Sequence, residues 1–421
     1  MHALLYHPLL IFSASLLAFT LTTQYTLRGS PWRYILLVFM SLCAYIFPHS
    51  IQSWSHTTGW LGRIAAGAVF WNIFTAFDKL ILRGWDYYNY PPVAGDGAST
   101  ATKVDLDPGT KDKDGKLPSH YPGTRSEFTN EVTGNARGIG LFWQVKNVPA
   151  FSKTQPAYVP SKSAFLLLNG TALIACYFLQ NLMVHVTLAS DRSLRTSAHA
   201  PLFARLDEVS WAELQTRVVV SLAFWIQQYC LLQFLYALFA IQGVVASGQD
   251  IKLWPPQFGP FEDACTIRGF WGKFWHQNLR CSMEGVTGWL AHDILRLPAR
   301  GLLQRYTKLF VSFIMSGMMH VMSDMGGGTP ARESGGLVFF PMQAVGIILE
   351  DLVQAAYLRL ASPGRGRTLR AVEMAVGYAW VLAFLVWTSP VWVFPIRTNV
   401  RLEDDLLSLD LYALNHVTAG R

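Results

Sequence analysis

His320 is the residue whose type and surroundings most strongly suggest chemistry. It lies in the stretch Leu309–Ser323, which carries no other ionisable side chain and is mostly apolar. An ionisable group at membrane depth is costly, so it tends to mark a functional position. A histidine with an ordinary pKa of about 6.5 can accept the proton of a hydroxyl group, which is general-base chemistry.

The neighbours of His320 at helical spacing extend this hypothesis. Ser316 shares a face with His320, and Asp324 follows one turn later, where its carboxylate could orient or charge-balance the imidazole. Gly317 lies one turn away and would allow close approach of a ligand or another helix. A histidine that only hydrogen-bonds to a neighbouring helix fits the pattern about equally well, so both interpretations stay open.

A second candidate cluster mixes aromatic rings with bases in the sequence Arg268-Gly-Phe-Trp-Gly-Lys-Phe-Trp-His-Gln-Asn-Leu-Arg280. A helix would place four rings on one broad apolar face with bases beside it: Phe270, Trp271, Phe274 and Trp275, flanked by Arg268, Lys273, His276 and Arg280. An amphipathic helix lying in the membrane interface explains this periodicity well. It does not explain the position of His276, directly after Trp275 and close to a possible catalytic span.

The composition indicates what must position these residues. The chain has 421 residues, of which 51% are hydrophobic and 14% are charged, against roughly 25% charged in an ordinary soluble domain. These values exclude a disordered chain and a typical cytosolic enzyme, and they favour a polytopic membrane protein. The net charge of +7 suits anionic lipid head groups or an anionic cosubstrate, and we expect no nucleic-acid partner.

The apolar runs predict an all-α polytopic membrane protein with about eight transmembrane helices and short amphipathic helices in the polar connections. A spanning helix needs about 20 mostly apolar residues. The runs are continuous and lack the alternation of a membrane barrel, and the first is an uncleaved helix because no basic region precedes it. The expected spans are 5–27, 34–48, 58–77, 163–190, 218–249, about 303–323, 336–358 and 374–396.

We divide the chain into three parts: N-terminal transmembrane helices (1–81), a polar connection with a mobile insert (82–162) and an acyltransferase-like membrane core (163–421). The insert is placed at Pro91–Gly134 because this stretch is rich in Gly, Asp, Lys, Pro and Thr. The next stretch, Arg137–Pro149, mixes glycines, aromatics and bases and is expected to be structured. The distribution of Lys and Arg puts the long connections in the cytosol and the N-terminus in the lumen.

The cysteines and remaining histidines predict no metal centre. Five cysteines are present without a CxxC pair, so we expect neither disulfides nor a metal site. His185, near the end of the fourth span, could pair with His320 around a haem, but no spacing supports this. Asn169-Gly-Thr171 matches the glycosylation pattern inside a span, where we expect it to be unused.

Two of these features together resemble a known family. Phe270-Trp-Gly-Lys-Phe-Trp-His276, preceded by Arg268 and followed at a distance by Ser316-Gly-Met-Met-His320, resembles the wax synthase-like branch of the membrane-bound O-acyltransferases. The similarity is closest to fungal acetyltransferases of terpenoid and meroterpenoid gene clusters. Arg137-Gly-Ile-Gly, Trp143–Pro149 and Trp254-Pro-Pro with Phe258-Gly are also similar to stretches of that group.

The resemblance implies acyl transfer from an acyl-CoA to a hydroxyl group, with His320 as the catalytic membrane histidine and His276 as the second catalytic position. Lys273-Phe274 stands where wax synthases often carry two arginines. We expect His276 or Asn278 to stabilise the tetrahedral oxyanion or to position the substrate. The supporting residues would be Trp275, Asn278, Ser316 and Asp324, and the CoA phosphates would meet Arg268, Lys273 and Arg280.

The sequence therefore predicts a multi-pass acetyltransferase of the endoplasmic reticulum in secondary metabolism. It would use acetyl-CoA as cosubstrate, hold no permanent cofactor, and esterify a hydroxyl of a hydrophobic terpenoid or meroterpenoid dissolved in the lipid bilayer. No serine or cysteine elbow is visible, so direct transfer is favoured over an acyl-enzyme. A long-chain wax or sterol ester synthase is the alternative within enzymes. A membrane transporter is the alternative of another class, although no paired broken helices are apparent.

Overall fold

The computed structural model describes residues 7–54, 59–90, 122–360 and 367–399, and every regular element within these ranges is helical. This confirms the predicted all-α class. Eight helices in the described chain are long and apolar enough to cross a membrane, as predicted. They are α2 (Pro8–Tyr25), α3 (Trp32–Trp54), α4 (Gly59–Ala76) with its π-helical extension η1 (Phe77–Leu82), α6 (Lys162–Ala189), α7 (Trp211–Val245), α10 (Leu302–Gly326), α11 (Gly336–Leu360) and α12 (Arg367–Thr388).

Short helices occupy the connections and the end of the described chain. They are α5 (Arg125–Gly134), η3 (Arg192–Leu194), η4 (Ser197–His199), η5 (Phe203–Arg205), η6 (Ile251–Leu253), η7 (Phe261–Cys265), α8 (Ile267–Gly269), η8 (Phe270–Phe274), α9 (Arg280–Trp289), η9 (Leu290–Ile294) and α13 (Pro390–Asn399). Two of them, η8 and η9, are π-helical turns, as is η1 at the end of α4. This geometry is rare in proteins, and it occurs frequently at functional sites.

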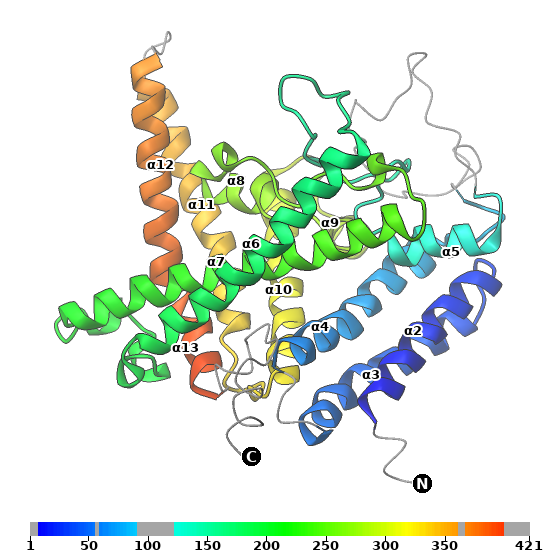
Figure 1. Ribbon diagram of the computed structural model, residues 1–421, viewed down its shortest axis with the longest axis horizontal. Helices are drawn as coiled ribbons and strands as arrows, with labels where there is room; N and C mark the ends of the chain where they lie inside the picture. The colour runs from blue at the N-terminus through cyan, green and yellow to red at the C-terminus, as the bar shows by residue number, and fades with distance from the viewer. Residues whose placement is uncertain (1–6, 55–58, 91–121, 361–366, 400–421) are drawn as a thin grey trace, which may run out of the picture.

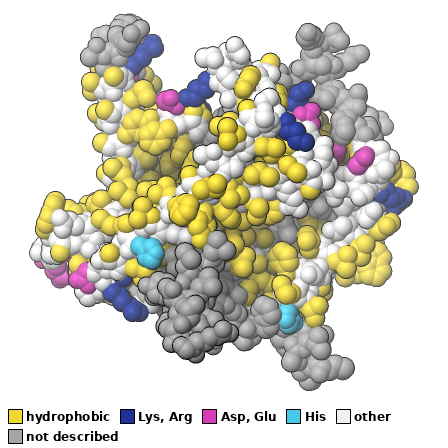
Figure 2. Space-filling view, in the orientation of Figure 1, with side chains coloured by type: hydrophobic (Ala, Val, Ile, Leu, Met, Phe, Trp, Pro, Cys, Tyr) yellow, Lys and Arg dark blue, Asp and Glu magenta, His cyan; other side chains and the backbone are white. Residues whose placement is uncertain are grey.

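Helix α10 lies in the middle of the molecule (Figure 1) and packs against α3, α4, α9 and α11. Helices α2 and α3 form an antiparallel pair at one edge, and α6 runs beside α7 along the other side of the bundle. Hydrophobic side chains cover most of the face shown in Figure 2, and charged side chains are sparse there. Apolar residues such as Val38 and Leu167 are 72% exposed within spans, as expected for side chains that contact lipid.

The predicted span 374–396 is wrong in extent, because α12 ends at Thr388 and α13 begins at Pro390. Proline has no N–H to continue the helical ladder, and its ring clashes with the preceding turn. The hydroxyl of Ser389 at the break accepts a hydrogen bond from the indole of Trp225 at 2.9 Å. The turn directs α13 into the core, where Trp392 is buried.

Helix α7 begins at Trp211, seven residues before the predicted start at 218. Its first turns carry Glu213 and Arg217, which the sequence seemed to exclude from a span. Both charges are satisfied locally: Arg205 Nη1 lies 3.1 Å from Glu213 Oε1, and Arg217 donates to backbone carbonyls before the helix. Ser210 caps the helix by accepting the Glu213 N–H.

Most of the predicted mobile insert lies outside the described residues, which resume at 122. Its last part is helix α5, so the prediction is wrong there. Thr124 and Glu127 form a reciprocal capping box at the start of α5. Phe128 and Val132 are fully buried, and α5 packs against α2.

The crossing of α4 and α10 depends on two glycines, which gives the first prediction. A Cβ on Gly326 would lie 2.3 Å from the Gly62 carbonyl oxygen and 2.5 Å from the Ala66 Cβ. Gly326→Ala should therefore destabilise the protein by ~1–3 kcal/mol, the usual cost of overpacking, seen as a lower thermal midpoint in detergent by tryptophan fluorescence. Gly170→Ala on α6 is the control, since nothing lies within 4 Å of its Cβ position. Equal midpoints for the two variants would contradict this account of the crossing.

Candidate active site

His320 lies in the last third of α10 with its imidazole against two aromatic rings. The ring of Phe340 stacks on it at 4.4 Å between centroids and 7° between planes. The ring of Trp392 meets it at 4.8 Å and 67°. Part of the His320 surface stays accessible, although Ser316 one turn earlier is buried. His320 is therefore less buried than Ser316, although two rings pack against its imidazole.

The glycine beside His320 serves helix packing. A Cβ on Gly317 would lie 3.1 Å from the carbonyl oxygen of Gly336, the first residue of α11. The reciprocal approach, from a Cβ on Gly336 to the Gly317 oxygen, is 3.2 Å. Of the two predicted uses of Gly317, the structure shows close approach of another helix, and this brings Phe340 of α11 onto His320.

Asp324 is buried and accepts two hydrogen bonds at the same oxygen, Oδ2. The donors are the Ser334 hydroxyl at 2.6 Å and the Trp392 indole N–H at 2.9 Å. The described residues show no hydrogen bond between Asp324 and His320. Asp324 is instead connected to His320 through Trp392, whose indole bonds to the carboxylate and packs against the imidazole.

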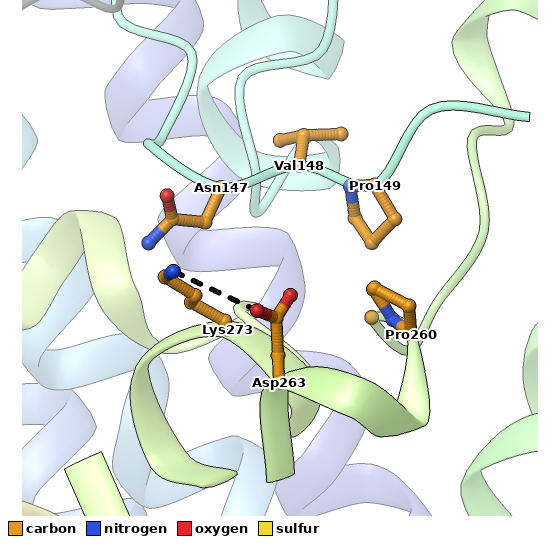
Figure 3. A pocket seen from close by; sticks show the side chains of 7 residues that line it. Asn147, Val148, Pro149, Pro260, Asp263 and Lys273 are labelled. Atoms are coloured by element: carbon orange, nitrogen blue, oxygen red, sulfur yellow. Dashed lines mark ion pairs between the residues drawn. The ribbon is translucent and has the colours of Figure 1, made fainter. Parts of the chain in front are cut away.

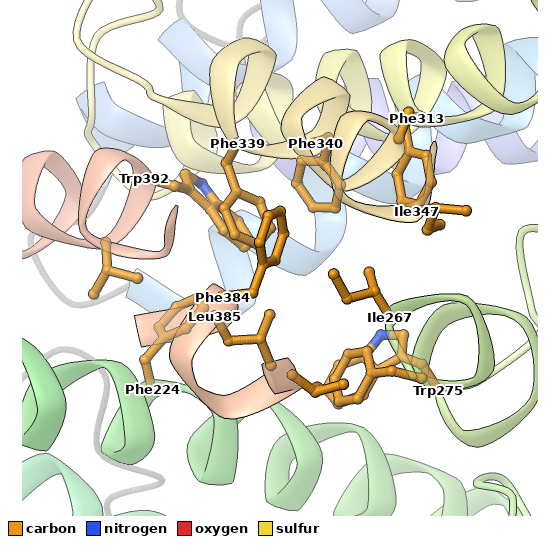
Figure 4. Packing of buried hydrophobic residues seen from close by; sticks show 14 of the residues in the cluster. Phe224, Ile267, Trp275, Phe313, Phe339, Phe340, Ile347, Phe384, Leu385 and Trp392 are labelled. Carbon is orange, nitrogen blue, oxygen red and sulfur yellow. The ribbon is translucent and has the colours of Figure 1, made fainter. Parts of the chain in front are cut away.

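The aromatic-basic segment is folded into the core and not laid on the membrane surface, so the interfacial-helix interpretation is wrong. Phe270 and Trp275 are buried, and their rings stack at 5.5 Å. The backbone N–H of Trp275 donates to the Phe270 carbonyl at 2.7 Å, and this bond closes the π-helical turn η8. Trp225 of α7 packs edge-on against Trp275 at 5.2 Å. Figure 4 shows Trp275 on one side of this hydrophobic cluster, with Phe340 and Trp392 on the other.

Two adjacent carboxylates of α11 hold the start of this segment. Glu350 accepts the backbone N–H groups of Ile267 at 2.8 Å and Arg268 at 3.0 Å. A buried carboxylate at the first turn of a helix satisfies donors that would otherwise lack partners. Asp351 accepts from Arg268 Nε at 3.0 Å, so the second acid pairs with an arginine. Trp271 adds a further bond, from its indole N–H to Gln343 of α11 at 3.2 Å.

His276 follows the π-helical turn and keeps one nitrogen unpaired. Its Nδ1 is buried, and no residue in the described ranges bonds to it. Burial, with a smaller contribution from the positive charge of Arg137, lowers the pKa of His276 to about 4, so the ring is neutral at physiological pH. His276 follows Trp275, which belongs to the same hydrophobic cluster as Phe340 and Trp392, the two rings that contact His320. The structure therefore brings the two predicted catalytic histidines together.

Arg137 joins two stretches that the sequence analysis singled out separately. Its guanidinium donates to the carbonyls of Pro255 at 2.9 Å and Pro256 at 2.7 Å. The hydroxyl of Tyr236 donates to the same Pro255 carbonyl at 2.8 Å. Arg137 thereby fixes the Trp254-Pro-Pro loop beside His276.

The three cations predicted to bind CoA already have partners within the protein. Arg268 pairs with Asp351, and Arg280 donates to Glu284 at 2.7 Å and to the Gly272 carbonyl at 3.1 Å. Lys273 is the most exposed of them, and its Nζ lies 3.6 Å from Asp263 Oδ1.

Lys273 borders a pocket of about 220 Å³ beside the aromatic-basic segment (Figure 3). Its lining consists of two chain segments and the end of η8: Asn147, Val148, Pro149, Gly259, Pro260, Asp263 and Lys273. Asn147 has a left-handed backbone (φ +61°), and its side chain donates to the Gly272 carbonyl at 2.9 Å. The pocket is thus built on the same turn that carries Lys273.

The remaining predicted positions are placed as follows. Asn278 is half-buried two residues after His276, and His185 is exposed on α6 whereas His320 faces the core. The haem alternative therefore has no support. No group of three or more His, Cys, Asp or Glu residues in the described parts of the chain is placed to hold a metal ion. Trp392 and Phe340 could not be selected from the sequence, because aromatic residues in apolar spans are common.

The chain is similar to known acyltransferases. Residues 254–342, which contain both histidines, match the model of the membrane bound O-acyl transferase family. Acetyltransferase fsoF of Humicola fuscoatra is 31% identical over 81% of this chain and 84% of its own. Acetyltransferase aurG of Calcarisporium arbuscula is 31% identical over 76% of each chain. Acetyltransferase spyB of Aspergillus fumigatus is 32% identical over 68% of this chain and 52% of its own. No solved structure matches.

The contact between Glu350 and the start of the aromatic-basic segment predicts that a substitution of the same size at Glu350 lowers the stability of the protein. Glu350→Gln keeps the size of the side chain but removes the charge and one of the two acceptor oxygens. Loss of charge-assisted hydrogen bonds should cost ~1.5–3 kcal/mol, lowering the thermal midpoint in detergent. Glu208→Gln is the control, because Glu208 is exposed and pairs with Arg205 at 3.0 Å, where ~0–1 kcal/mol is expected. Similar midpoints would show that Glu350 does not hold the segment.

The lowered pKa of His276 predicts a dependence of stability on pH. In the unfolded chain its pKa returns to about 6.5, so between pH ~6.5 and ~4 the unfolded state binds a proton that the folded state does not. Folding stability therefore falls as the pH drops through this window. On moving from pH ~7.5 to ~5, the wild-type midpoint should fall further than that of His276→Asn. His185→Asn, at an exposed position, should behave as wild type. An equal fall in His276→Asn would contradict the burial of a neutral His276.

Proposed function

The chain belongs to the membrane-bound O-acyl transferase family, and we propose that it transfers an acetyl group from acetyl-CoA to a hydroxyl of a hydrophobic terpenoid or meroterpenoid intermediate. It is a multi-pass membrane enzyme that uses an acyl-CoA. The observation that carries the finer proposal is the pairing of an accessible His320 with a neutral His276 inside an aromatic interior. That interior suits a greasy acceptor, and the similar fungal proteins bear the name acetyltransferase.

His320 acts as the general base in this mechanism. An alcohol is a poor nucleophile at neutral pH, so its proton must leave as the oxygen attacks the thioester carbonyl. His320 accepts that proton while the C–O bond forms. Collapse of the tetrahedral intermediate breaks the C–S bond, and the proton passes to the departing CoA thiolate. The histidine returns to its neutral form, and no acyl-enzyme is required.

His276 stabilises the negative charge that develops on the thioester oxygen. A neutral imidazole can donate one N–H, and the buried Nδ1 of His276 has no partner among the described residues. A donor that is fixed before the reaction and shielded from water is the arrangement that stabilises an oxyanion well. Trp275 and Ser316 serve as supporting residues by packing beside the two histidines, and Asn278 supplies a further amide near the same site.

Lys273 is the best placed of the three predicted cations to contact CoA. Arg268 and Arg280 are tied to acids and carbonyls that hold the motif segment, so their first role is structural. Lys273 is 55% exposed at the edge of the pocket in Figure 3, where a phosphate could replace or join Asp263 as its partner. The positive-inside pattern puts this pocket on the cytosolic side, from which CoA would arrive.

The remaining finer assignments follow from the same reasoning. The enzyme would reside in the endoplasmic reticulum with its N-terminus in the lumen, and residues 163–421 would form the acyltransferase core. The names of the relatives favour the acetyl donor over the long-chain alternative. Because the chain is an acyltransferase, the transporter alternative is not retained.

The central test is His320→Ala assayed with microsomes or purified protein, acetyl-CoA and a panel of terpenoid alcohols. Loss of a general base should lower kcat by ~10²–10⁴-fold. His185→Ala is the matched control, since that histidine is exposed on α6 and should leave ester formation unchanged. Full activity of a well-folded His320→Ala protein would remove His320 from the mechanism. Ester formation only from long-chain acyl-CoA would replace the donor assignment.

The role of Lys273 predicts a selective change in KM. Lys273→Ala should raise KM for acetyl-CoA about fivefold, equivalent to ~1 kcal/mol for a partly exposed charged contact, while kcat stays near wild type. Lys153→Ala is the control, because Lys153 is 60% exposed and also pairs with an acid, Glu262. If both variants bind acetyl-CoA as wild type does, the pocket is not the CoA entrance.

A further inference from the structure

The imidazole of His320 is held by rings rather than by hydrogen bonds. Phe340 covers its face and Trp392 meets it nearly edge-on, at centroid distances of 4.4 and 4.8 Å. In the described chain no side chain or backbone group hydrogen-bonds to either ring nitrogen. Among the residues that the structure describes, neither nitrogen has a partner, and none of these residues fixes the rotation of the ring by a polar contact.

That rotation needs a constraint if His320 is to act as a base. The terminal torsion of histidine has broad, weakly separated minima, and a general base must be within hydrogen-bond reach of the proton it accepts. Many catalytic histidines are oriented by a hydrogen bond to the second nitrogen. In this protein the two aromatic contacts must supply the orientation, so the positions of the two rings matter.

Of the two rings, Trp392 has a polar anchor. Its indole N–H donates to Asp324 Oδ2 at 2.9 Å, and both residues are nearly fully buried, at 4% and 2% exposure. Asp324 lies one turn after His320 on α10, whereas Trp392 comes from α13. The same Oδ2 accepts from Ser334 at 2.6 Å, and the Ser334 hydroxyl accepts the Gly336 N–H at 3.2 Å. One carboxylate thus fixes α13 to α10 and to the start of α11.

We propose that Trp392 is a positioning residue for His320, and that Asp324 acts on the histidine through the indole N–H of Trp392. The bond fixes the plane of the indole, and the indole fixes the imidazole between itself and Phe340. This inference rests on the proposed function of His320. It assigns a role to α13, which lies outside the residues matched by the family model.

The test breaks one hydrogen bond from both ends. Trp392→Phe keeps an aromatic ring without the N–H, and Asp324→Asn keeps the size of the acceptor without its charge. Each should lower kcat for ester formation by about 10–100-fold, as small misplacements of catalytic groups do. KM for acetyl-CoA should stay near wild type, and the thermal midpoint should fall by no more than that of Glu350→Gln, which also weakens hydrogen bonds to a buried carboxylate. Because both changes break the same bond, the double variant should lose no more than the worse single variant.

Matched controls separate positioning from general damage. Trp387→Phe on α12 removes an indole that packs on Phe203 and Phe384 instead, and should keep wild-type kcat. Asp250→Asn removes an exposed carboxylate that caps η6, and should also be neutral. His320→Ala is assayed in the same series to test the base itself.

The outcomes are distinguishable. An inactive His320→Ala protein with wild-type kcat in Trp392→Phe and Asp324→Asn would overturn the positioning role and leave the proposed function intact. Full activity of His320→Ala would overturn both. Three other results would assign Trp392 and Asp324 to general structure and overturn the proposal. They are additive losses of kcat in the double variant, a rise in KM in step with the fall in kcat, and failure of both variants to fold while the controls fold. A fall in kcat alone, without additivity, supports it.

Discussion

The cost of placing an ionisable base among apolar helices is the constraint on which the rest of this site depends. Water is scarce in the bundle interior, so an imidazolium there would be poorly stabilised. His320 can therefore work only as a neutral ring that holds a proton briefly. The protein meets this requirement with aromatic contacts, which fix the ring without occupying its nitrogens. The polar group that holds the Trp392 ring lies a turn away, at Asp324, whose Oδ2 accepts two hydrogen bonds.

Helix α11 connects the two histidines. It begins two residues after Ser334, which bonds to Asp324, and it carries Phe340 against His320. Further along, Gln343 bonds to Trp271, and Glu350 accepts the N–H groups that begin the segment leading to His276. Pro341 lies between Phe340 and Gln343, at a position where the helical hydrogen-bond ladder loses one donor. The spacing between the two proposed catalytic histidines thus depends on one helix, to which neither histidine belongs.

The sequence was sufficient to predict the membrane spans because lipid imposes a length of about 20 apolar residues. It was insufficient where local chemistry overrides composition. Glu213 and Arg217 enter α7 because each finds a partner at the helix start, and Pro390 ends α12 although the apolar run continues. Helix α5 lay in a stretch interpreted as a mobile insert, and only its capping box could have indicated otherwise.

The site shows the same division between residue type and tertiary contact. Both histidines could be selected from the sequence, because an ionisable group in an apolar run and a histidine after an aromatic cluster are local signals. Their proximity could not be predicted, since it depends on how α8 packs on α11. Trp392 gave no local signal at all, and Arg280 looked like a phosphate ligand until its carbonyl partners were visible. The two histidines and Asp324 could be selected from local signals, whereas the rings of Phe340 and Trp392 that contact His320 could not.

The distribution of these positioning residues along the chain has a consequence for substrate choice. The region matched by the family model, 254–342, contains both histidines. Four of the side chains that orient this region come from elsewhere: Arg137, Trp225, Glu350 and Trp392. Relatives can therefore keep the same reaction in the matched region, while substitutions in the surrounding helices change the side chains that line the interior. If His320 is the base, as proposed, differences in α7, α11 and α13 would change the surroundings of the acceptor and so the alcohols that such an enzyme esterifies.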